Sequence, residues 1–283
     1  MRADFIKIVL ILILLNNINT LYTLNIKILW WNLYNFFDTT DDPKKDDKIL
    51  SIEEYNKKIS LVVEKIKKIN PDIIGLGEIE NINVLKDIAL KSGYAYYYLE
   101  EGNDPRGIDI ALLSKYKIEE YITSKNRIIP YDENPNYKFS RDLTVAVLNI
   151  NNIKFYILTT HLKSMIKNGK NEKKKRAQIF GILDIIEEIY QKENSPNIIL
   201  MGDFNSHRYT EALNILEKSG LIILNYLYNE KYFYTYNNKK DLDYFIINKN
   251  IKEKIKSKNL KVFNKKDFIK ISDHFPLLLE IEF

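Results

Sequence analysis

Apolar residues recur along this 283-residue chain with two periods, one typical of helices and one typical of strands. The helical spacing predicts helices over 51–69, 173–190 and 210–218. The first of these opens with Ser51-Ile52-Glu53-Glu54, which has the pattern of a capping box, and Asn70-Pro71 ends it. Both long helices carry apolar residues along one face, as helices packed against a core do.

Short runs of apolar and β-branched residues predict the strands. They fall at 25–31, 72–77, 108–113, 143–150, 153–160, 197–201, 243–247 and 275–283. Asn151-Asn152 tolerates the positive φ of a tight turn and joins two of these strands as a hairpin. Strands and helices are interleaved and no repeat or linker divides them, so we predict a single α/β domain over 24–283.

Polar side chains that could carry chemistry stand where the predicted strands end. Six lie at or just past such an end: Asn32, Glu78, His161, Asp203, Asn205 and His274. Proteins of the α/β class gather their sites at strand ends, so one edge of the fold could hold all six. Asp beside Asn, and Asp beside His, suit an oxygen-ligated Mg²⁺ and an activated water.

The first 23 residues have the pattern of a targeting segment. Arg2 and Lys7 flank the start of an unbroken apolar run over 8–15, whose length fits a signal peptide and is too short to span a bilayer. Residues 16–23 contain no Ala-x-Ala cleavage site, so an uncleaved anchor or a buried first strand are the alternatives. We predict a signal peptide or N-terminal anchor over 1–23, an exported protein, and membrane contact through this segment only.

Composition narrows the chemistry. The chain has no Cys and three His, which excludes disulfides and thiolate metal sites and leaves little for a zinc site built from imidazoles. A hydrophobic content of 45% is ample for a large core. The net charge of +5 is compatible with a polyanionic partner but does not identify one.

Eight short strings give the chain its clearest resemblance. In order they are Trp31-Asn32-Leu33-Tyr34-Asn35, Gly77-Glu78-Ile79-Glu80-Asn81, Arg106-Gly107-Ile108-Asp109, Ser140-Arg141-Asp142-Leu143, His161-Leu162-Lys163-Ser164, Gly202-Asp203-Phe204-Asn205, Leu242-Asp243-Tyr244 and Ser272-Asp273-His274. Together they resemble the endonuclease/exonuclease/phosphatase superfamily, and in particular its bacterial secreted Mg²⁺-dependent nucleases. The resemblance implies a four-layer sandwich of two mixed β-sheets flanked by helices, and Mg²⁺-assisted cleavage of a phosphoester.

The resemblance and the chemistry of the side chains assign roles to these residues. Glu78, Asn32 and Asp273 are predicted oxygen ligands for Mg²⁺, with Mn²⁺ as an alternative ion. His274 has the pKa class of a general base near neutral pH. Asp243 is expected to fix the tautomer of His274, since the matching residues pair in the family.

Three further residues are predicted to act on the reacting groups. Asp203 and Asn205 are two positions apart, so both side chains point to one side of an extended chain, and we expect them to orient the attacking water and a phosphate oxygen. His161 and Asn205 would stabilise the charge that develops on the phosphoryl group. Asp109 is a candidate partner for a site His, and His207 is expected only to lie adjacent to the site.

Basic residues are the candidate substrate contacts. Only six of the 43 basic residues are Arg, so an Arg kept against this bias suits a planar contact with phosphate. Arg141 is the candidate for that contact, together with Lys163, whereas Arg106 could equally form an ion pair or pack in a loop. The basic cluster Lys173-Lys174-Lys175-Arg176, with Lys167 and Lys170, either follows a nucleic-acid backbone or is a solvated helix start.

The leading hypothesis is an exported, Mg²⁺-dependent endonuclease that hydrolyses DNA, with RNA as a second substrate and no obligate protein partner. A sphingomyelinase-type phosphodiesterase is an alternative, but the sequence offers no Trp/Phe-rich hairpin to enter a bilayer, and the Tyr94–Tyr98 cluster alternates like a core strand. Inositol phosphatases of the superfamily carry a Cys-containing motif that this chain lacks. A non-catalytic binding module on the same scaffold is a further alternative, against which the intact set of acids and imidazoles argues.

Overall fold

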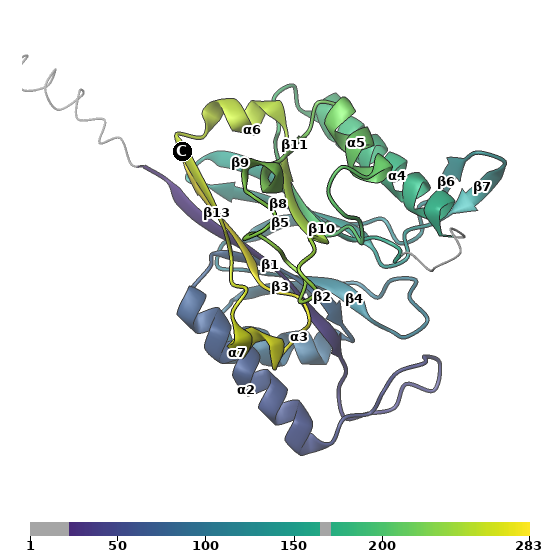
Figure 1. The fold of residues 1–283 in the computed structure, drawn as a ribbon, viewed down its shortest axis with the longest axis vertical. Coiled ribbons are helices and arrows are strands. Elements are labelled where there is room, and N and C mark those ends of the chain that lie inside the picture. Colours follow the sequence, from purple (N-terminus) through teal and green to yellow (C-terminus); the bar gives the residue numbers. More distant parts are fainter. Residues whose placement is uncertain (1–22, 165–170) are drawn as a thin grey trace, which may run out of the picture.

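Two six-stranded β-sheets lie face to face, and helices cover the outer side of each sheet (Figure 1). The computed structural model of the chain describes residues 23–164 and 171–283. This architecture confirms the four-layer α/β sandwich that the resemblance implies.

The first sheet, sheet A, contains the N-terminal and C-terminal strands. Its members are β1 (Asn25–Phe36), β2 (Ile73–Ile79), β3 (Tyr96–Leu99), β4 (Asp109–Ser114), β13 (Ser257–Val262) and β14 (Leu277–Glu282). The strand order is β13-β14-β1-β2-β4-β3. Central strands β1 and β2 run parallel and the other neighbouring pairs are antiparallel, so the carboxyl ends of β1 and β2 meet at one edge.

The second sheet, sheet B, repeats this plan. Its members are β5 (Ile118–Thr123), β8 (Leu143–Ile150), β9 (Ile153–His161), β10 (Asn197–Asp203), β11 (Ile222–Ile223) and β12 (Asp243–Ile247). The strand order is β11-β12-β10-β9-β8-β5, with β9 and β10 as the parallel pair. Asn151 and Asn152 both have positive φ between β8 and β9, which confirms the predicted hairpin turn. A separate hairpin consists of β6 (Ile129–Tyr131) and β7 (Asn134–Tyr137).

Helices close the outer faces of both sheets. Helices α2 (Ile52–Ile69), α3 (Ile82–Ser92) and α7 (Lys266–Ile269) pack on sheet A, and α4 (Glu172–Lys192) and α5 (Glu211–Lys218) pack on sheet B. Ser51 Oγ accepts a hydrogen bond from the Glu54 backbone and the Glu54 side chain accepts one from the Ser51 backbone, so the capping box is confirmed. The 3₁₀ helix η1 (Leu224–Leu227) contacts β12, and α6 (Lys249–Lys254) contacts β10.

The core between the sheets depends on a close approach at Gly75 of β2. Trp30 of β1 is fully buried in one apolar cluster with Met201 of β10 and Phe245 of β12. A Cβ atom on Gly75 would lie 2.7 Å from Met201 Cε and 2.9 Å from Trp30 Cε3. The missing side chain at Gly75 therefore makes room for the Trp30 ring between the sheets.

Several elements differ from their sequence prediction. Strand β1 continues past Trp31 to Phe36, so Asn32 lies inside the strand and not after it. Strand β3 is an edge strand whose Tyr98 is 40% exposed, so the Tyr94–Tyr98 cluster is not a core strand. Strands β5 and β13 were missed because they lie at sheet edges and carry charged residues, which break the apolar pattern.

The predicted N-terminal segment over 1–23 lies outside the described residues except for Thr23, and Lys167 and Lys170 also lie outside them. Over 23–164 and 171–283, every helix is too short or too polar to cross a bilayer. The signal-peptide or anchor assignment therefore stays a prediction.

The close approach at Gly75 yields a stability prediction. We expect Gly75→Ala to lower the free energy of unfolding by about 1–3 kcal/mol, because the added methyl overpacks the core against Trp30 and Met201. Urea unfolding measures this loss. Met201→Val removes the flexible Cε that lies nearest to the added methyl. The loss in the free energy of unfolding of the double variant should therefore be smaller than the sum of the two single losses. Additive losses would show that Met201 is not what the new methyl meets.

Candidate active site

Asp203, the last residue of β10, is the centre of a polar cluster at the edge of sheet B. It is in register with His161, the last residue of β9, and with Asp243, the first residue of β12. Residues opposite each other in a sheet project their side chains to the same face. Asp203 Oδ2 consequently lies 3.3 Å from His161 Nε2. Three predicted site residues thus come together through strand register alone.

Sheet A contributes Glu78 and Asn32. Glu78 has a φ of 61° where β2 shifts register against β1 and β4, and such a bulge re-aims a side chain. Its Oε1 lies 4.0 Å from His161 Nε2, and its Oε2 accepts a 2.7 Å hydrogen bond from the Asn35 backbone. Asn32 Nδ2 donates to Glu78 Oε1 at 3.3 Å and to Asp203 Oδ2 at 3.1 Å. The Asn32 amide therefore joins carboxylates from both sheets.

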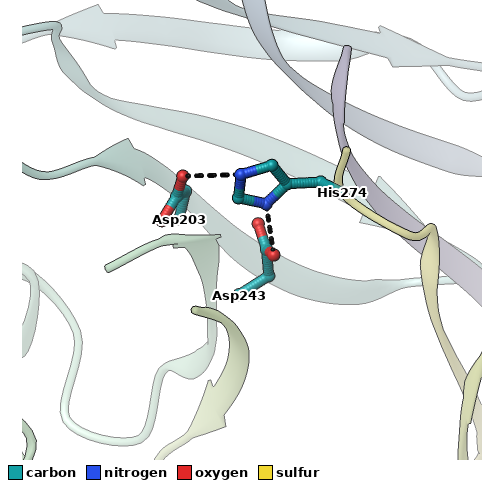
Figure 2. Close-up of side chains that lie close together, drawn as sticks. All are labelled: Asp203, Asp243 and His274. Carbon is teal, nitrogen blue, oxygen red and sulfur yellow. Dashed lines mark hydrogen bonds and ion pairs between the residues drawn. The ribbon is translucent and has the colours of Figure 1, made fainter. Parts of the chain in front are cut away.

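His274 lies in the segment before β14 and is held by Asp243 (Figure 2). His274 Nδ1 lies 2.7 Å from Asp243 Oδ2, while Asp243 Oδ1 accepts a 2.7 Å hydrogen bond from the Trp30 indole. Asp243 is acceptor-only when ionised, so the Nδ1 proton faces it and His274 Nε2 faces Asp203 Oδ2, 3.7 Å away. The structure thus pairs Asp243 with His274, as the resemblance implies.

The surrounding carboxylates decide the charge of His274. Burial by itself would lower the pKa of His274, but the charges of Asp243, Asp203 and Asp273 outweigh it and raise this pKa to about 10. Burial and the Asp243 charge raise the pKa of Asp203 to about 7. At neutral pH His274 is therefore protonated, and Asp203 is the group that exchanges a proton near pH 7.

His161 is neutral for the opposite reason. Burial, followed by the positive charges of Arg141 and His274, holds the pKa of His161 well below its usual range. Its Nε2 faces Asp203 and Glu78, which both accept hydrogen bonds, so the tautomer with a proton on Nε2 fits this position. His161 therefore offers a neutral N–H donor to the cluster.

Asp273, Glu78 and Asn32 fit a hard divalent cation. Asp273 Oδ1 is buried and has no hydrogen-bond partner among the described residues. Burial raises the pKa of Asp273, the charge of His274 opposes this shift, and the charge of Glu78 adds to it. Asn32 Oδ1 accepts a hydrogen bond from the Tyr34 backbone at 2.9 Å, so the Asn32 amide would rotate to offer its oxygen. Such an oxygen donor set suits Mg²⁺.

Asp203, Asp243 and His274 also place ligand atoms within 4.8 Å of one another. Both Asp243 oxygens and His274 Nδ1 already form the hydrogen bonds with Trp30 and with each other. This group is therefore better suited to holding and moving protons than to binding a metal ion.

Asn205 follows Asp203 in a left-handed conformation with a φ of 47°. Its backbone N–H donates to Asp203 Oδ1 at 2.8 Å, and its Nδ2 donates to the Leu162 carbonyl at 3.0 Å. Lys175 Nζ lies 2.5 Å from the Asn205 carbonyl oxygen. Lys175 is almost completely buried, so it fixes the Asn205 turn from behind.

The basic cluster at the start of α4 is only partly available to a substrate. Besides Lys175, Lys173 is paired with Asp132 at 2.6 Å, and Arg176 is paired with Glu211 at 2.5 Å. Lys174 differs, because burial and then the charges of Lys163 and Arg141 lower its pKa. Lys174 therefore lies with the two predicted substrate contacts, whereas its neighbours have structural partners.

Arg141 is buried behind the site. Its Nε lies 3.0 Å from Asp104 Oδ2, and its Nη1 donates to the Leu162 carbonyl at 3.2 Å. Arg106 also pairs with Asp104, at 3.1 Å, and donates to Asn35 Oδ1 at 3.1 Å. Arg106 thus forms the ion pair that the sequence left open, and the phosphate contact of Arg141 stays a prediction.

Two candidates lie beside the cluster. Asp109 accepts a 2.7 Å hydrogen bond from the Gly102 backbone, and no bond to a His is found within 23–164 and 171–283. His207 is exposed and lines two surface cavities, one of which reaches Asn205. His207 is therefore adjacent to the site, as expected, while the supporting role of Asp109 lacks a contact.

Sequence reasoning missed three residues that shape the site: Trp30, Lys58 and Tyr236. Lys58 of α2 donates to the Tyr34 carbonyl at 2.8 Å. Burial lowers the pKa of Lys58 to about 8, against the nearby Glu78 charge. The Tyr236 ring lies 4.8 Å from the His274 ring. No sequence signal marks these residues except that the only two Trp are adjacent, because their contacts join distant segments.

Comparison with known proteins gives one family. A model of the endonuclease/exonuclease/phosphatase family matches residues 27–220, a stretch that includes Asn32, Glu78, His161 and Asp203. No curated protein sequence matches the chain.

Solved structures share the fold at low sequence identity. The catalytic domain of human nocturnin with bound sulfate is 20% identical with a TM-score of 0.65, over 91% of this chain and 94% of that one. Truncated TDP2 of Caenorhabditis elegans is 16% identical with a TM-score of 0.63, over 91% and 97%. A mannosyl-6-phosphatase of Bacteroides thetaiotaomicron is 16% identical with a TM-score of 0.61, over 91% and 100%. The chain therefore belongs to the endonuclease/exonuclease/phosphatase family, whose members are hydrolases of phosphodiester or phosphate bonds.

Proposed function

We propose that this protein is an exported, Mg²⁺-dependent phosphodiesterase that hydrolyses nucleic acid, with DNA as its main substrate. The observation that carries the proposal is the position of Asp203, whose Oδ2 lies 3.3 Å from His161 Nε2 and 3.7 Å from His274 Nε2. A carboxylate between two imidazoles, beside the oxygen donors of Glu78 and Asp273, can receive a phosphoester and a water at one place.

Each residue of the site has a proposed part in the reaction. Glu78, Asp273 and Asn32 would hold the cation, and Mg²⁺ bound there would polarise a phosphate oxygen. His161 donates a hydrogen bond from its Nε2–H to a phosphate oxygen, and the Asn205 turn orients the phosphoryl group. Both groups are held in place before substrate arrives, so they lose little free energy by reorganising.

The raised pKa values of His274 and Asp203 give these two groups different parts in the reaction. The sequence predicts His274 as the general base, but with a pKa raised to about 10 it already holds a proton at neutral pH. Asp203, with its pKa raised to about 7, is the better acceptor for the proton of the attacking water. We therefore propose Asp203 as the base, and the His274 imidazolium as the positive charge that stabilises the transition state.

Charge around the site supports a polymeric anion as substrate. Lys163 and Arg141 lie close enough to Lys174 for their charges to lower its pKa, and the whole chain has a net charge of +5. Cations that continue beyond the reacting phosphate suit a chain of phosphates better than a single one. Exposed large apolar residues of the described chain, such as Ile52, Leu90 and Phe180, belong to separate helices and not to one hairpin that could enter a bilayer.

The direct test offers the purified protein plasmid DNA, RNA, sphingomyelin and mannose 6-phosphate, each with Mg²⁺ or with EDTA. We expect the fastest turnover on DNA, a KM for DNA that rises steeply with salt, and no turnover in EDTA. Faster cleavage of sphingomyelin than of DNA would favour the lipid phosphodiesterase, and fastest turnover of mannose 6-phosphate would favour a phosphatase.

A matched pair of variants locates the cation in this test. Glu78→Gln should raise the Mg²⁺ concentration needed for half-maximal activity by on the order of tenfold or more, because it removes a ligand charge. It should also weaken the increase in melting temperature that Mg²⁺ produces. Glu53→Gln, an exposed carboxylate on α2, is the control and should change neither value. Equal behaviour of the two variants would remove Glu78 from the metal site.

The pH profile distinguishes the two candidate bases. A base with a pKa raised to about 7 is protonated below that pH, so kcat/KM should fall as the pH drops through about 7. Asp203→Asn should abolish this limb and lower kcat on the order of 10²-fold or more. A profile that rises only near pH 10 in the wild type would instead identify neutral His274 as the base.

Export is the part of the proposal that rests on the sequence of residues 1–23. Expressed in a bacterial host, the full chain should leave the cytoplasm, whereas a chain that starts at residue 24 should remain there. Nuclease assays on separated cell fractions measure this difference. Retention of both chains in the cytoplasm would contradict the targeting assignment.

A further inference from the structure

Two adjoining surface cavities extend from the active site along the segments that follow β10 and precede β12. The nearer cavity, of about 570 Å³, is lined by Asn205 and Lys175 on its active-site side. The farther cavity, of about 690 Å³, is lined by Arg208, Lys231 and Tyr232. Both cavities are lined by His207 and Lys240. We call the two together the His207–Lys240 groove.

Hydrogen bonds connect residues on two sides of the groove with the catalytic residues. Asn205 forms one wall, and its backbone N–H donates to Asp203 Oδ1 at 2.8 Å. On the other side, Tyr236 pairs through its backbone with both Lys240 and His274. A ligand in the nearer cavity therefore meets Asn205, which is hydrogen-bonded to Asp203.

Arg208 is a buried cation in the wall of the farther cavity. Its side chain is 5% exposed, its Nε lies 2.6 Å from Asp241 Oδ2, and its Nη1 donates to the Tyr228 carbonyl at 2.6 Å. Arg208 Nη2 and Asp241 Oδ1 are both buried without a hydrogen-bond partner among the described residues. Both atoms are closed to solvent, so a ligand in the cavity does not reach them, and the Arg208–Asp241 ion pair instead holds the cavity wall in place.

The surface around Arg208 is cationic and aromatic. Lys231, Lys239 and Lys240 are exposed and have no ion-pair partner within the described part of the chain. The acidic residues that line the farther cavity are Glu230 and Asp241, and the cations that line it outnumber them. The Tyr232 ring is 69% exposed, with Lys231 Nζ 5.3 Å from its centroid. Cations along a groove with an exposed ring are the features that bind single-stranded nucleic acid.

We propose that the His207–Lys240 groove binds a single-stranded segment of nucleic acid on one side of the scissile phosphodiester. Lys239 and Lys240 contact its phosphates, and Tyr232 stacks on one of its bases. This inference rests on the proposed nuclease function and specifies where the substrate continues beyond the reacting phosphate. It predicts that the groove contributes to binding of a polymer and not to the chemical step.

The test measures binding of a fluorescein-labelled 12-nucleotide DNA strand by anisotropy in EDTA, and its cleavage in Mg²⁺. The groove variant Lys231→Glu/Lys239→Glu/Lys240→Glu changes three exposed residues, so it should fold normally. We expect it to raise Kd and KM for the strand at least about tenfold. Its log Kd against log salt should be shallower by about 2, since each phosphate contact of a single strand contributes about 0.7. Turnover of bis(4-nitrophenyl) phosphate should not change.

A control variant separates the groove from general charge. Lys249→Glu/Lys252→Glu/Lys256→Glu alters net charge equally, but these exposed residues follow the other end of β12, away from Asp243. Tyr232→Ala should weaken strand binding about 5- to 100-fold, as loss of one stacked base does.

The outcomes test the groove inference and the proposed nuclease function separately. Equal losses in the groove and control variants, or an unchanged Kd in Tyr232→Ala, would overturn the groove while leaving nuclease activity established by the wild type. If the wild type cleaves no nucleic acid, the proposed function fails, and anisotropy in EDTA still decides the groove. A wild type that does not bind the strand would overturn the groove inference.

Discussion

The two oxygens of Asp243 form the constraint on which the site depends. Asp243 begins a strand of sheet B, yet both hydrogen-bond partners of its carboxylate, Trp30 and His274, belong to sheet A or to the segment that enters it. The two sheets can keep these bonds only at one separation and one relative orientation. Packing of Trp30 over Gly75 sets that separation, so the core that stabilises the fold also positions the His274 imidazole.

A second constraint comes from concentrating carboxylates in a buried space. Burial raises the pKa of Asp203 and of Asp273, and the neighbouring charges of Asp243 and Glu78 add to these two shifts. The protonated His274 balances part of this negative charge. Beside Glu78, Asp273 Oδ1 has no hydrogen-bond partner among the described residues. The same imbalance that would destabilise a structural cluster provides a place for a divalent cation and a proton acceptor near pH 7.

Much of this arrangement could be predicted from the sequence. Apolar periodicity identified the long helices and the central strands. These elements bury a continuous face, so their apolar residues recur with a regular spacing in the sequence. The strand-end positions of Glu78, His161 and Asp203 followed, since parallel strands deliver side chains to a common edge. Edge strands β5 and β13 could not be read in this way, because only one neighbouring strand restricts their residues and charged side chains are tolerated there.

The sequence by itself determined the alternating α/β plan, the absence of thiol chemistry and a set of acids and imidazoles in a recognisable order. Tertiary structure alone decided which of those groups act on one another. The bulge that turns Glu78, the indole that binds Asp243 and the burial of Lys175 beneath Asn205 arise from contacts between residues far apart in the chain. Likewise, the charge states of His274 and Asp203 depend on how many carboxylates surround them once water is excluded. Local sequence encodes backbone preference and apolar pattern, whereas distance and dielectric environment exist only after the sheets have packed.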